Sequence, residues 1–478
     1  MMNISQWKFP VLCGVFLLMY VVSGCNDDSS DDEAQNPILR VFHAVSDMGT
    51  ITFLMDESAW ANLEFGDSIS AQVDPEQYET NFDTALPDDD TDICLGDEDD
   101  DGVKDDDECT RLAPGSINLV RNQEYLLVLF GQYNDLEVLE YEKPYHEFDT
   151  QDEDEDGDAE DENMEVQFVH LAESLGQVDV YLEPPGTNLS PTQAIGTLSL
   201  KGEFHTLVDE DDYVLTLTAV ADPGTVYFTS NTFSMKKQSR VIFAIRDSAG
   251  DSSSAVKVQF FGDQDGTLTD RNADTTLRIV HAVADGENID VFSDNDFSEP
   301  FASNLEFGQA SDFITVFPGS LTNLSLDVTP AGDPGIFLAR ENVTLTRGTQ
   351  NSFYLIGETD NWDGIKSTDD RRRLTTHARL KLINGANSTV LDFYIAEPNS
   401  NIGTLSPTAS LAYRLSTGYQ RFDPGTYEIV LTYSDTSTIV YGPQTIELSA
   451  GGLYTIIATT DTSDPTAAGA LLLDDFVN

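Results

Sequence analysis

Four stretches of sequence decide the fold, because each repeats one pattern of apolar and polar residues. They are "ILRVFHAVSDMGTITF" (residues 38–53), "EVQFVHLAESLGQVDVY" (165–181), "TLRIVHAVADGENIDVF" (276–292) and "ARLKLINGANSTVLDFY" (378–394). One position of the pattern holds a polar ring or amide: His43, His170, His281 and Asn384. A later position holds Thr52, Asp179, Asp290 and Asp392. Self-similarity of this kind indicates a repeat architecture, and the spacing predicts four domains, each long enough for one β-sandwich.

Two further motifs show that the copies alternate. The first and third copies share "NLEFG" (62–66 and 304–308), whereas the second and fourth share "LSPT" (189–192 and 405–408). The order is therefore A-B-A′-B′, which indicates that a pair of domains was duplicated as a pair.

The remaining sequence favours strands throughout. Alternating apolar and polar residues, β-branched and aromatic runs and Pro-Gly turns recur at short intervals, and no amphipathic helix is evident after the N-terminal segment. We predict an all-β protein of four tandem immunoglobulin-like antiparallel β-sandwiches with about seven strands each. The predicted sandwiches span 38–147, 164–262, 276–366 and 376–478, and the predicted linkers span 148–163, 263–275 and 367–375. The last linker carries "DDRRRL" (369–374), which we expect to be exposed and protease-sensitive.

The charge balance limits the possible partners. The chain has 85 acidic and 24 basic residues, for a net charge of −61. Such a field repels nucleic acid phosphates and anionic lipids, and it favours divalent cations. Two explanations stay open and are compatible: adaptation to a saline habitat, where salt screens the repulsion, and a cation-binding role.

The N-terminus is typical of an export signal. Lys8 precedes an apolar run from Val11 to Val22, which is too short to span a bilayer and suits a signal peptide over residues 1–24. The following "VSGC" resembles the lipobox of bacterial lipoproteins, which implies a lipid on Cys25; the alternative is a plain signal peptide followed by an unmodified cysteine. Residues 25–37 then form an acidic tether. We expect a lipid-anchored protein of the cell envelope, in the outer membrane.

The chain as a whole resembles a family of uncharacterised bacterial surface or secreted lipoproteins. The family's tandem β-sandwich repeats have an "R-x-x-H-A" opening (40–44 and 278–282), a "V-D-V-Y" strand (178–181) and a "P-G-x-Y" turn (424–427). The fourth copy departs from the pattern at Asn384, and the first at Thr52. The resemblance implies the fold and the location and carries no established activity.

An acidic insertion in the first copy, residues 92–109, matches a calcium loop. Oxygen ligands are expected at loop positions 1, 3, 5, 7, 9 and 12, where the sequence has Asp97, Asp99, Asp101, Val103 (through its carbonyl), Asp105 and Glu108. Gly102 permits the sharp turn. Cys94 and Cys109 flank the loop and are predicted to form a disulfide, because they are the remaining even pair in an exported chain. The alternative is a chance match within an acidic run.

Two other sets are given structural roles. A second acidic run, Asp152–Asn163, lacks the closing glutamate and is predicted to be an extended linker; the alternative is a second calcium site. One histidine per domain cannot build a metal cluster, so we predict buried imidazoles bonded to the backbone. The repeated aspartates are predicted to be strand-end or turn partners.

No catalytic motif stands out in the sequence. We therefore predict a non-enzymatic, lipid-anchored repeat rod with a structural, adhesive or ligand-presenting role and a Ca²⁺-stabilised loop. Its expected partner is a glycan, a matrix polymer or another envelope protein. The alternative is a protein that binds or degrades extracellular polysaccharide; an enzyme of that class would show a cleft with paired carboxylates, one of them with a raised pKa.

Overall fold

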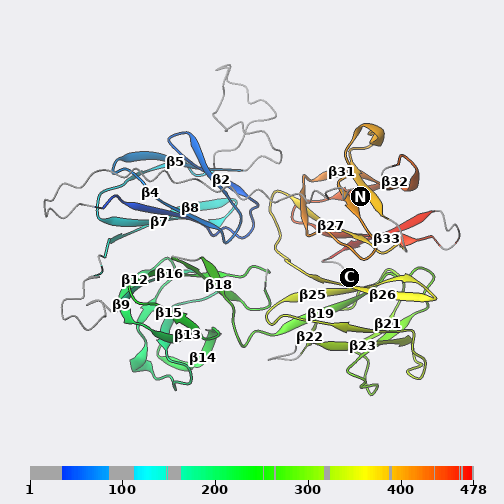
Figure 1. The fold of residues 1–478 in the computed structure, drawn as a ribbon, viewed down its shortest axis with the longest axis horizontal. Helices are drawn as coiled ribbons and strands as arrows, with labels where there is room; N and C mark the ends of the chain where they lie inside the picture. Colours follow the sequence, from blue (N-terminus) through cyan, green and yellow to red (C-terminus); the bar gives the residue numbers. More distant parts are fainter. Residues whose placement is uncertain are drawn as a thin grey trace, which may run out of the picture. The chain divides into compact units, whose positions relative to one another are not determined.

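The computed structural model consists of strands joined by loops. It describes residues 35–84, 112–146, 148, 163–250, 252–262, 265–316, 323–386, 390–434, 436–461, 463 and 467–475. Apart from two short 3-10 turns, η1 (Pro191–Gln193) and η2 (Ile402–Thr404), the regular elements of these residues are β-strands (Figure 1). The all-β prediction is confirmed. Among the same residues, no helix has the length and apolar character needed to cross a bilayer. Residues Asn36–Asn478 form one compact unit, and every contact described below lies within it.

Sandwich 1 has two four-stranded sheets, ordered β4-β1-β7-β8 and β3-β2-β5-β6. Its strands are β1 (Ile38–His43), β2 (Ile51–Met55), β3 (Ser58–Leu63), β4 (Ser68–Gln72), β5 (Gln77–Thr84), β6 (Gly115–Asn118), β7 (Gln123–Gln132) and β8 (Asp135–Pro144).

Sandwich 2 has the sheets β12-β9-β16-β17-β18 and β11-β10-β13-β14, with β15 paired to β13. Its strands are β9 (Asn163–Leu171), β10 (Val178–Glu183), β11 (Gly196–Leu198), β12 (Glu203–Asp209), β13 (Asp211–Ala219), β14 (Asp222–Thr229), β15 (Phe233–Met235), β16 (Arg240–Asp247), β17 (Val256–Phe261) and β18 (Gly266–Leu268). Strand β18 falls inside the stretch predicted to be a linker, because three residues are too few to give a strand signal.

Sandwich 3 has the sheets β22-β19-β25-β26 and β21-β20-β23-β24. Its strands are β19 (Thr275–His281), β20 (Ile289–Ser293), β21 (Ala302–Leu305), β22 (Ile314–Val316), β23 (Leu324–Pro330), β24 (Ala339–Val343), β25 (Gln350–Glu358) and β26 (Asn361–Thr368).

Sandwich 4 repeats this order in β30-β27-β33-β34 and β29-β28-β31-β32. Its strands are β27 (Ala378–Asn384), β28 (Leu391–Ala396), β29 (Ala409–Leu411), β30 (Gln420–Phe422), β31 (Gly425–Tyr433), β32 (Ile439–Leu448), β33 (Leu453–Thr460) and β34 (Ala468–Asp474).

Each first sheet contains one parallel pair, where only antiparallel pairing was expected. The first strand of each repeat lies parallel to a later strand in β1–β7, β9–β16, β19–β25 and β27–β33. Parallel neighbours need a long connection, and the strands of the second sheet supply it.

An eighth strand then reverses the chain. Strand β8 is antiparallel to β7, and β7 is parallel to β1. Strand β8 therefore ends at the same end of the sheet at which β1 begins. Strand β26 does the same beside β25 in sandwich 3. In a seven-stranded immunoglobulin-like domain, the chain would instead leave at the end of the sandwich opposite to the one at which it enters. The extra strand therefore brings the next sandwich alongside.

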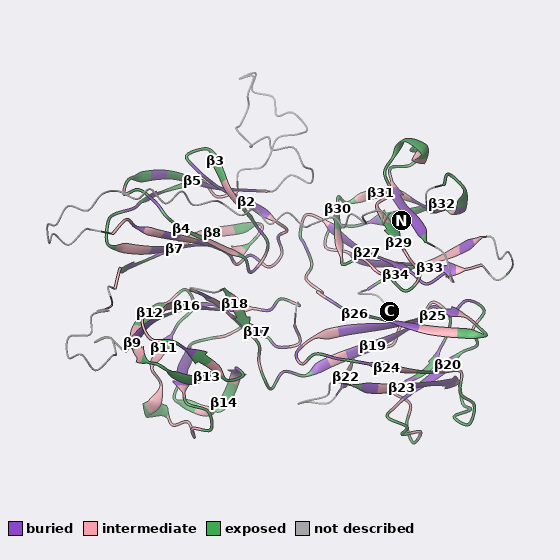
Figure 2. Ribbon diagram, in the orientation of Figure 1, coloured by how far each residue is buried: buried purple, intermediate pink, exposed green. Residues whose placement is uncertain are grey.

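Each sandwich has its own apolar core between its two sheets, visible as buried inner strands in Figure 2. Two more apolar clusters lie outside these cores. One joins the first sheets of sandwiches 1 and 2 through residues such as Phe42, Val128 and Phe261. The other joins the first sheets of sandwiches 3 and 4 through Val280 and Ile383, among others. These first sheets are therefore buried on both faces, as parallel-containing sheets usually are. The two clusters support the A-B pair as the repeating unit.

Charged side chains reinforce both junctions. Lys143 of β8 contacts Glu165 of β9 at 2.5 Å and Glu124 at 2.8 Å. At the second junction, the linker residue Asp369 contacts Lys381 of β27 at 2.5 Å. These groups are almost fully buried, so each charge depends on its partner.

Sandwich 1 also contacts the segment that precedes sandwich 4. The Thr375 N–H donates to the Asp47 carbonyl at 2.8 Å, and its hydroxyl donates to the Asp47 carboxylate at 2.6 Å. The expected rod, with sandwiches joined only end to end, does not allow this contact. The rod prediction was wrong because the returning eighth strand was not anticipated.

Candidate functional site

The repeated histidines have structural roles. In the first three sandwiches, Nε2 lies 2.9–3.1 Å from the carbonyl oxygen six residues later, and Nδ1 accepts the N–H two residues later at 3.2–3.4 Å. The partners are Gly49 and Val45 for His43, Gly176 and Ala172 for His170, and Glu287 and Val283 for His281. In sandwich 4, the amide of Asn384 replaces the ring, accepting from Ala386 N and donating to the Leu411 carbonyl. The prediction of buried, backbone-bonded imidazoles is confirmed.

These hydrogen bonds require a neutral ring, because Nδ1 must accept while Nε2 donates. Burial is the main cause that lowers the pKa of His43 to about 4; the bond to Gly49 opposes the shift, and the charges of Arg372 and Arg246 add to it. Burial also lowers the pKa of His170 and of His281. Each of the three rings therefore fixes the loop that follows the first strand, and we call this arrangement a histidine lock.

The repeated aspartates form a cross-strand pair with threonine. The second and fifth strands place the two residues opposite each other in Asp179–Thr218, Asp290–Thr329 and Asp392–Thr432. In sandwich 1 the residues are exchanged between strands, as Thr52 opposite Asp83. The first copy therefore keeps the pair that Thr52 alone suggested it had lost.

The carboxylates hold turns, as predicted. Asp290 accepts the N–H of Asn304 and that of Gly332, both at 2.8 Å. Asp179 accepts the Ala221 N–H at 2.7 Å in the equivalent turn. Ala221 and Gly332 follow the fifth strands, β13 and β23. In sandwich 1, the fifth strand leads instead into the acidic insertion, and the second-strand aspartate is replaced by Thr52.

The predicted calcium loop belongs to that connection, since residues 85–114 join β5 to β6. Asp97, Asp99, Asp101, Val103, Asp105 and Glu108 lie outside the described residues, and so do Cys94, Cys109 and the lipidation position Cys25. Within the described ranges, no three His, Cys, Asp or Glu side chains gather in a way that could hold a metal ion.

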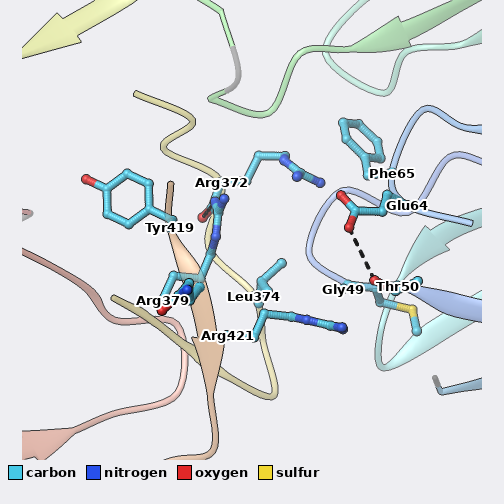
Figure 3. Close-up of a pocket in the computed structure, with 11 residues that line it drawn as sticks. Gly49, Thr50, Glu64, Phe65, Arg372, Leu374, Arg379, Tyr419 and Arg421 are labelled. Atoms are coloured by element: carbon cyan, nitrogen blue, oxygen red, sulfur yellow. Dashed lines mark hydrogen bonds between the residues drawn. The ribbon is translucent and has the colours of Figure 1, made fainter. Parts of the chain in front are cut away.

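A cleft of about 210 Å³ lies between sandwich 1 and sandwich 4 (Figure 3). Sandwich 1 lines it with Met48, Gly49, Thr50, Glu64 and Phe65. The linker and sandwich 4 line it with Arg372, Leu374, Arg379, Tyr419, Gln420 and Arg421. Three guanidinium groups and one carboxylate thus share this cleft, in a chain whose net charge is −61.

One carboxylate of the linker organises two of these arginines. Asp370 accepts from Nε and Nη2 of Arg372 at 2.9–3.1 Å and from Nη2 of Arg379 at 2.9 Å. Burial raises the pKa of Asp370, but the hydrogen bonds and charges of Arg372 and Arg379 outweigh it and lower that pKa to about 2. The guanidinium of Arg372 is therefore held in place through its Nε and Nη2 atoms.

An aromatic ring fixes Arg372 from the other side. Phe65 lies under two guanidinium groups, with its centroid 4.8 Å from Cζ of Arg372 and 4.3 Å from Cζ of Arg246. Such contacts favour cations over the ring face. Phe65 therefore joins sandwich 1 to sandwich 2 and to the linker.

Arg421 approaches the cleft over a glycine. A Cβ atom on Gly49 would collide with the Arg421 guanidinium, so the small residue leaves room for that side chain. Figure 3 shows Arg421 extending toward Gly49 and Arg372 extending toward Phe65 and Glu64. Glu64 itself accepts from the Thr50 hydroxyl at 3.5 Å.

This cleft was not among the sequence predictions. The linker motif "DDRRRL" was expected to be exposed. Arg373 is exposed, but Asp369 and Leu374 are buried, and Arg371 and Arg372 are half-buried. The prediction holds for Arg373 and was wrong for Arg371 and Arg372, because aromatic rings from other segments, Phe313 and Phe65, lie against their guanidinium groups. The one available signal was three adjacent arginines in a chain that has few basic residues.

A family model described as "Domain of unknown function (DUF4397)" matches residues 275–394, which cover sandwich 3 and the start of sandwich 4. No curated protein matches the chain. The Bacillus anthracis TIE protein is 8% identical with a TM-score of 0.15, and the match covers 86% of this chain but 66% of that protein, less than two thirds of its length. A candidate cell adhesion protein from Bacteroides eggerthii DSM 20697 is 10% identical with a TM-score of 0.14, over 66% of this chain and 95% of that one. TM-scores this low support no inference about this chain.

Proposed function

We propose that this chain is a non-enzymatic, lipid-anchored protein of the cell envelope with a structural or adhesive role. Its A-B pairs serve as scaffolds, and its loops and cleft present binding groups to a glycan, a matrix polymer or another envelope protein. In this proposal Cys25 carries the lipid, in the outer membrane, and Ca²⁺ stabilises the loop between β5 and β6.

The burial of the paired first sheets is the observation that carries the proposal. Phe42 and Phe261 pack at 4.8 Å between ring centroids across the first junction, and Lys143 is buried with its two glutamates beside them. Buried apolar contacts and buried charge pairs both resist sliding of one sandwich on the other. A scaffold that transmits load between an anchor and a partner needs such junctions.

The composition of the cleft favours binding over hydrolysis. A glycoside hydrolase of the common type needs two carboxyl groups facing one bond, and Glu64 is the single carboxylate that lines this cleft. Asp67 has a raised pKa through burial and the nearby charge of Glu64, but its carboxylate accepts the Glu64 N–H at 3.1 Å within a turn. The alternative function was binding or degradation of extracellular polysaccharide, and the cleft supports binding.

Anchoring and adhesion are tested together in cells. We expect the full-length protein to take up labelled palmitate, fractionate with the outer membrane and increase attachment of cells to polysaccharide-coated surfaces. The Cys25→Ser variant should lose all three properties, whereas Cys13→Ser, inside the predicted signal, should keep them. Unchanged membrane retention of Cys25→Ser contradicts the anchor. Release of new reducing ends from polysaccharides by the purified protein contradicts the non-enzymatic role.

Calcium binding is tested by calorimetric titration of the purified mature chain. We expect one saturable site in the unmodified protein and its loss in Asp97→Ala and in Glu108→Ala, because each removes a ligand from the loop. Asp156→Ala is the matched control, since it removes one charge from the other acidic run. Equal heats in all four proteins contradict the calcium site.

A further inference from the structure

The cleft between sandwich 1 and sandwich 4 offers hydrogen-bond donors that the protein does not use. The side chain of Arg421 forms no hydrogen bond or ion pair with another described residue, and the residue is exposed. Arg372 uses Nε and Nη2 on Asp370, and its Nη1 has no hydrogen-bond partner among the described residues. Both guanidinium groups can therefore donate to a ligand in the cleft, Arg421 on the side of Gly49 and Arg372 on the side of Phe65 and Glu64.

The same cleft offers acceptors. Oε1 of Gln420 is buried and has no hydrogen-bond partner in the described part of the chain. Glu64 has its carboxylate on the opposite wall, bonded only through one oxygen to Thr50. A buried acceptor without a partner is costly, and a hydroxyl donor from a ligand would satisfy it. A sulfate dianion has no hydroxyl to donate.

The size and charge of the cleft limit the class of ligand further. A volume of about 210 Å³ is smaller than the roughly 300–1,000 Å³ of pockets that hold drug-sized molecules. The cleft can therefore hold one monosaccharide unit. A long polyanion is excluded because a net charge of −61 repels it, whereas a single acidic residue on a neutral glycan meets the local field of the cleft, where three arginines outnumber one glutamate.

We propose that this cleft binds one acidic sugar residue of the uronate class. Arg421 holds its carboxylate, Arg372 donates through Nη1 to a hydroxyl oxygen, and Gln420 and Glu64 accept from its hydroxyl groups. The sugar class rests on the proposed envelope location, where glycans are the exposed polymers. Gly49 acts as a positioning residue, because its lack of a Cβ atom lets Arg421 reach over it.

The test is calorimetric titration of the full mature protein with galacturonate, and with galactose, sulfate and glycine as comparison ligands. We expect galacturonate to bind and the three others to bind at least about tenfold more weakly, since each lacks either the carboxylate or the hydroxyl set. Arg421→Gln should weaken galacturonate at least about tenfold. Gly49→Ala should weaken it as well while keeping every charge.

Arg271→Gln is the matched control, because it removes an exposed arginine that does not line the cleft. It should leave the affinity unchanged. The proposal is overturned by no binding of galacturonate, by equal affinity for any comparison ligand, or by equal affinity of Arg421→Gln and the unmodified protein. None of these results alters the palmitate, attachment or calcium measurements, so failure of this proposal is distinct from failure of the proposed function.

Discussion

Sandwiches 1 and 3 are the two A copies, and they use the same arginine differently. Arg278 is 2% exposed and contacts Asp475, which is 1% exposed, at 2.5 Å. Arg40, at the equivalent position, is 12% exposed and lies 3.6 Å from Asp265, which is 44% exposed. Both copies keep an arginine at this strand position. Its ion pair is partly exposed at the first junction and buried at the second.

The loops of the two copies differ more than their strands. Sandwich 3 joins its fifth and sixth strands through residues 331–338, with Asp290 holding Gly332, whereas sandwich 1 uses residues 85–114. Phe307 is 40% exposed in sandwich 3, whereas its counterpart Phe65 lies against two guanidinium groups. The two A copies therefore share their strands, whereas their loops differ in length and contacts.

The largest expected effect separates the two arginines. Arg278→Met leaves Asp475 buried without its cation and should destabilise the second junction by about 3–5 kcal/mol. Arg40→Met removes a half-exposed pair and should cost about 1 kcal/mol or less. Hydrogen exchange of the amides in β27 and β9 measures the two losses. Equal effects at both positions would show that burial does not distinguish the pairs.

The next effect concerns the histidine that the two copies share. The pKa of His43 is about 4 when folded, against 6.5 for the ordinary group, so the unfolded chain binds a proton first as the pH falls. The stability from the neutral ring is complete above pH 6.5 and decreases by about 3 kcal/mol as the pH falls to 4.

His43→Asn copies the natural Asn384 arrangement and should remove this part of the acid dependence. Urea unfolding at pH 7 and at pH 4.5, monitored by hydrogen exchange in β1, measures the difference between the two proteins. His205→Asn, at a surface histidine, is the control and should keep the original dependence. An identical acid slope for His43→Asn and the unmodified protein would rule out the lock.

The smallest effect tests the exchanged aspartate–threonine pair. Asp290→Ala leaves the N–H groups of Asn304 and Gly332 without an acceptor and should destabilise sandwich 3 by about 1–3 kcal/mol. Thr52→Val removes one hydroxyl bond to Asn62 at 2.7 Å, which is solvent-exposed, and should cost less than about 1 kcal/mol. Exchange of the amides in 330–339 and in β3 reports the losses. A larger cost at Thr52 than at Asp290 would contradict the view that the aspartate, and not the threonine, holds the turn.

The strand pattern was predictable from sequence because it depends on local alternation. The histidine locks were also predictable, since a single imidazole beside an apolar strand has few partners other than the backbone. The burial of both faces of strands such as β27 could not be predicted, because Arg379 and Lys381 give the sequence a half-exposed pattern. Both are buried by partners in the preceding linker.

The cleft could not be predicted, because its walls come from segments more than 300 residues apart. Gly49 and Glu64 meet Arg372 and Arg421 through the packing of whole sandwiches, which no local spacing reports. The parallel pairing of the first strand with a later strand was equally unpredictable, since both orientations show the same alternation.

The doubly buried first sheets have a consequence for how such chains grow. A single sandwich added or lost would leave one apolar sheet face in water, with an arginine deprived of its carboxylate. Selection should remove such a chain through aggregation, whereas a copied pair arrives with its faces already covered. Gene duplication in this architecture should therefore proceed in steps of two sandwiches, and the A-B-A′-B′ order is the record of one such step.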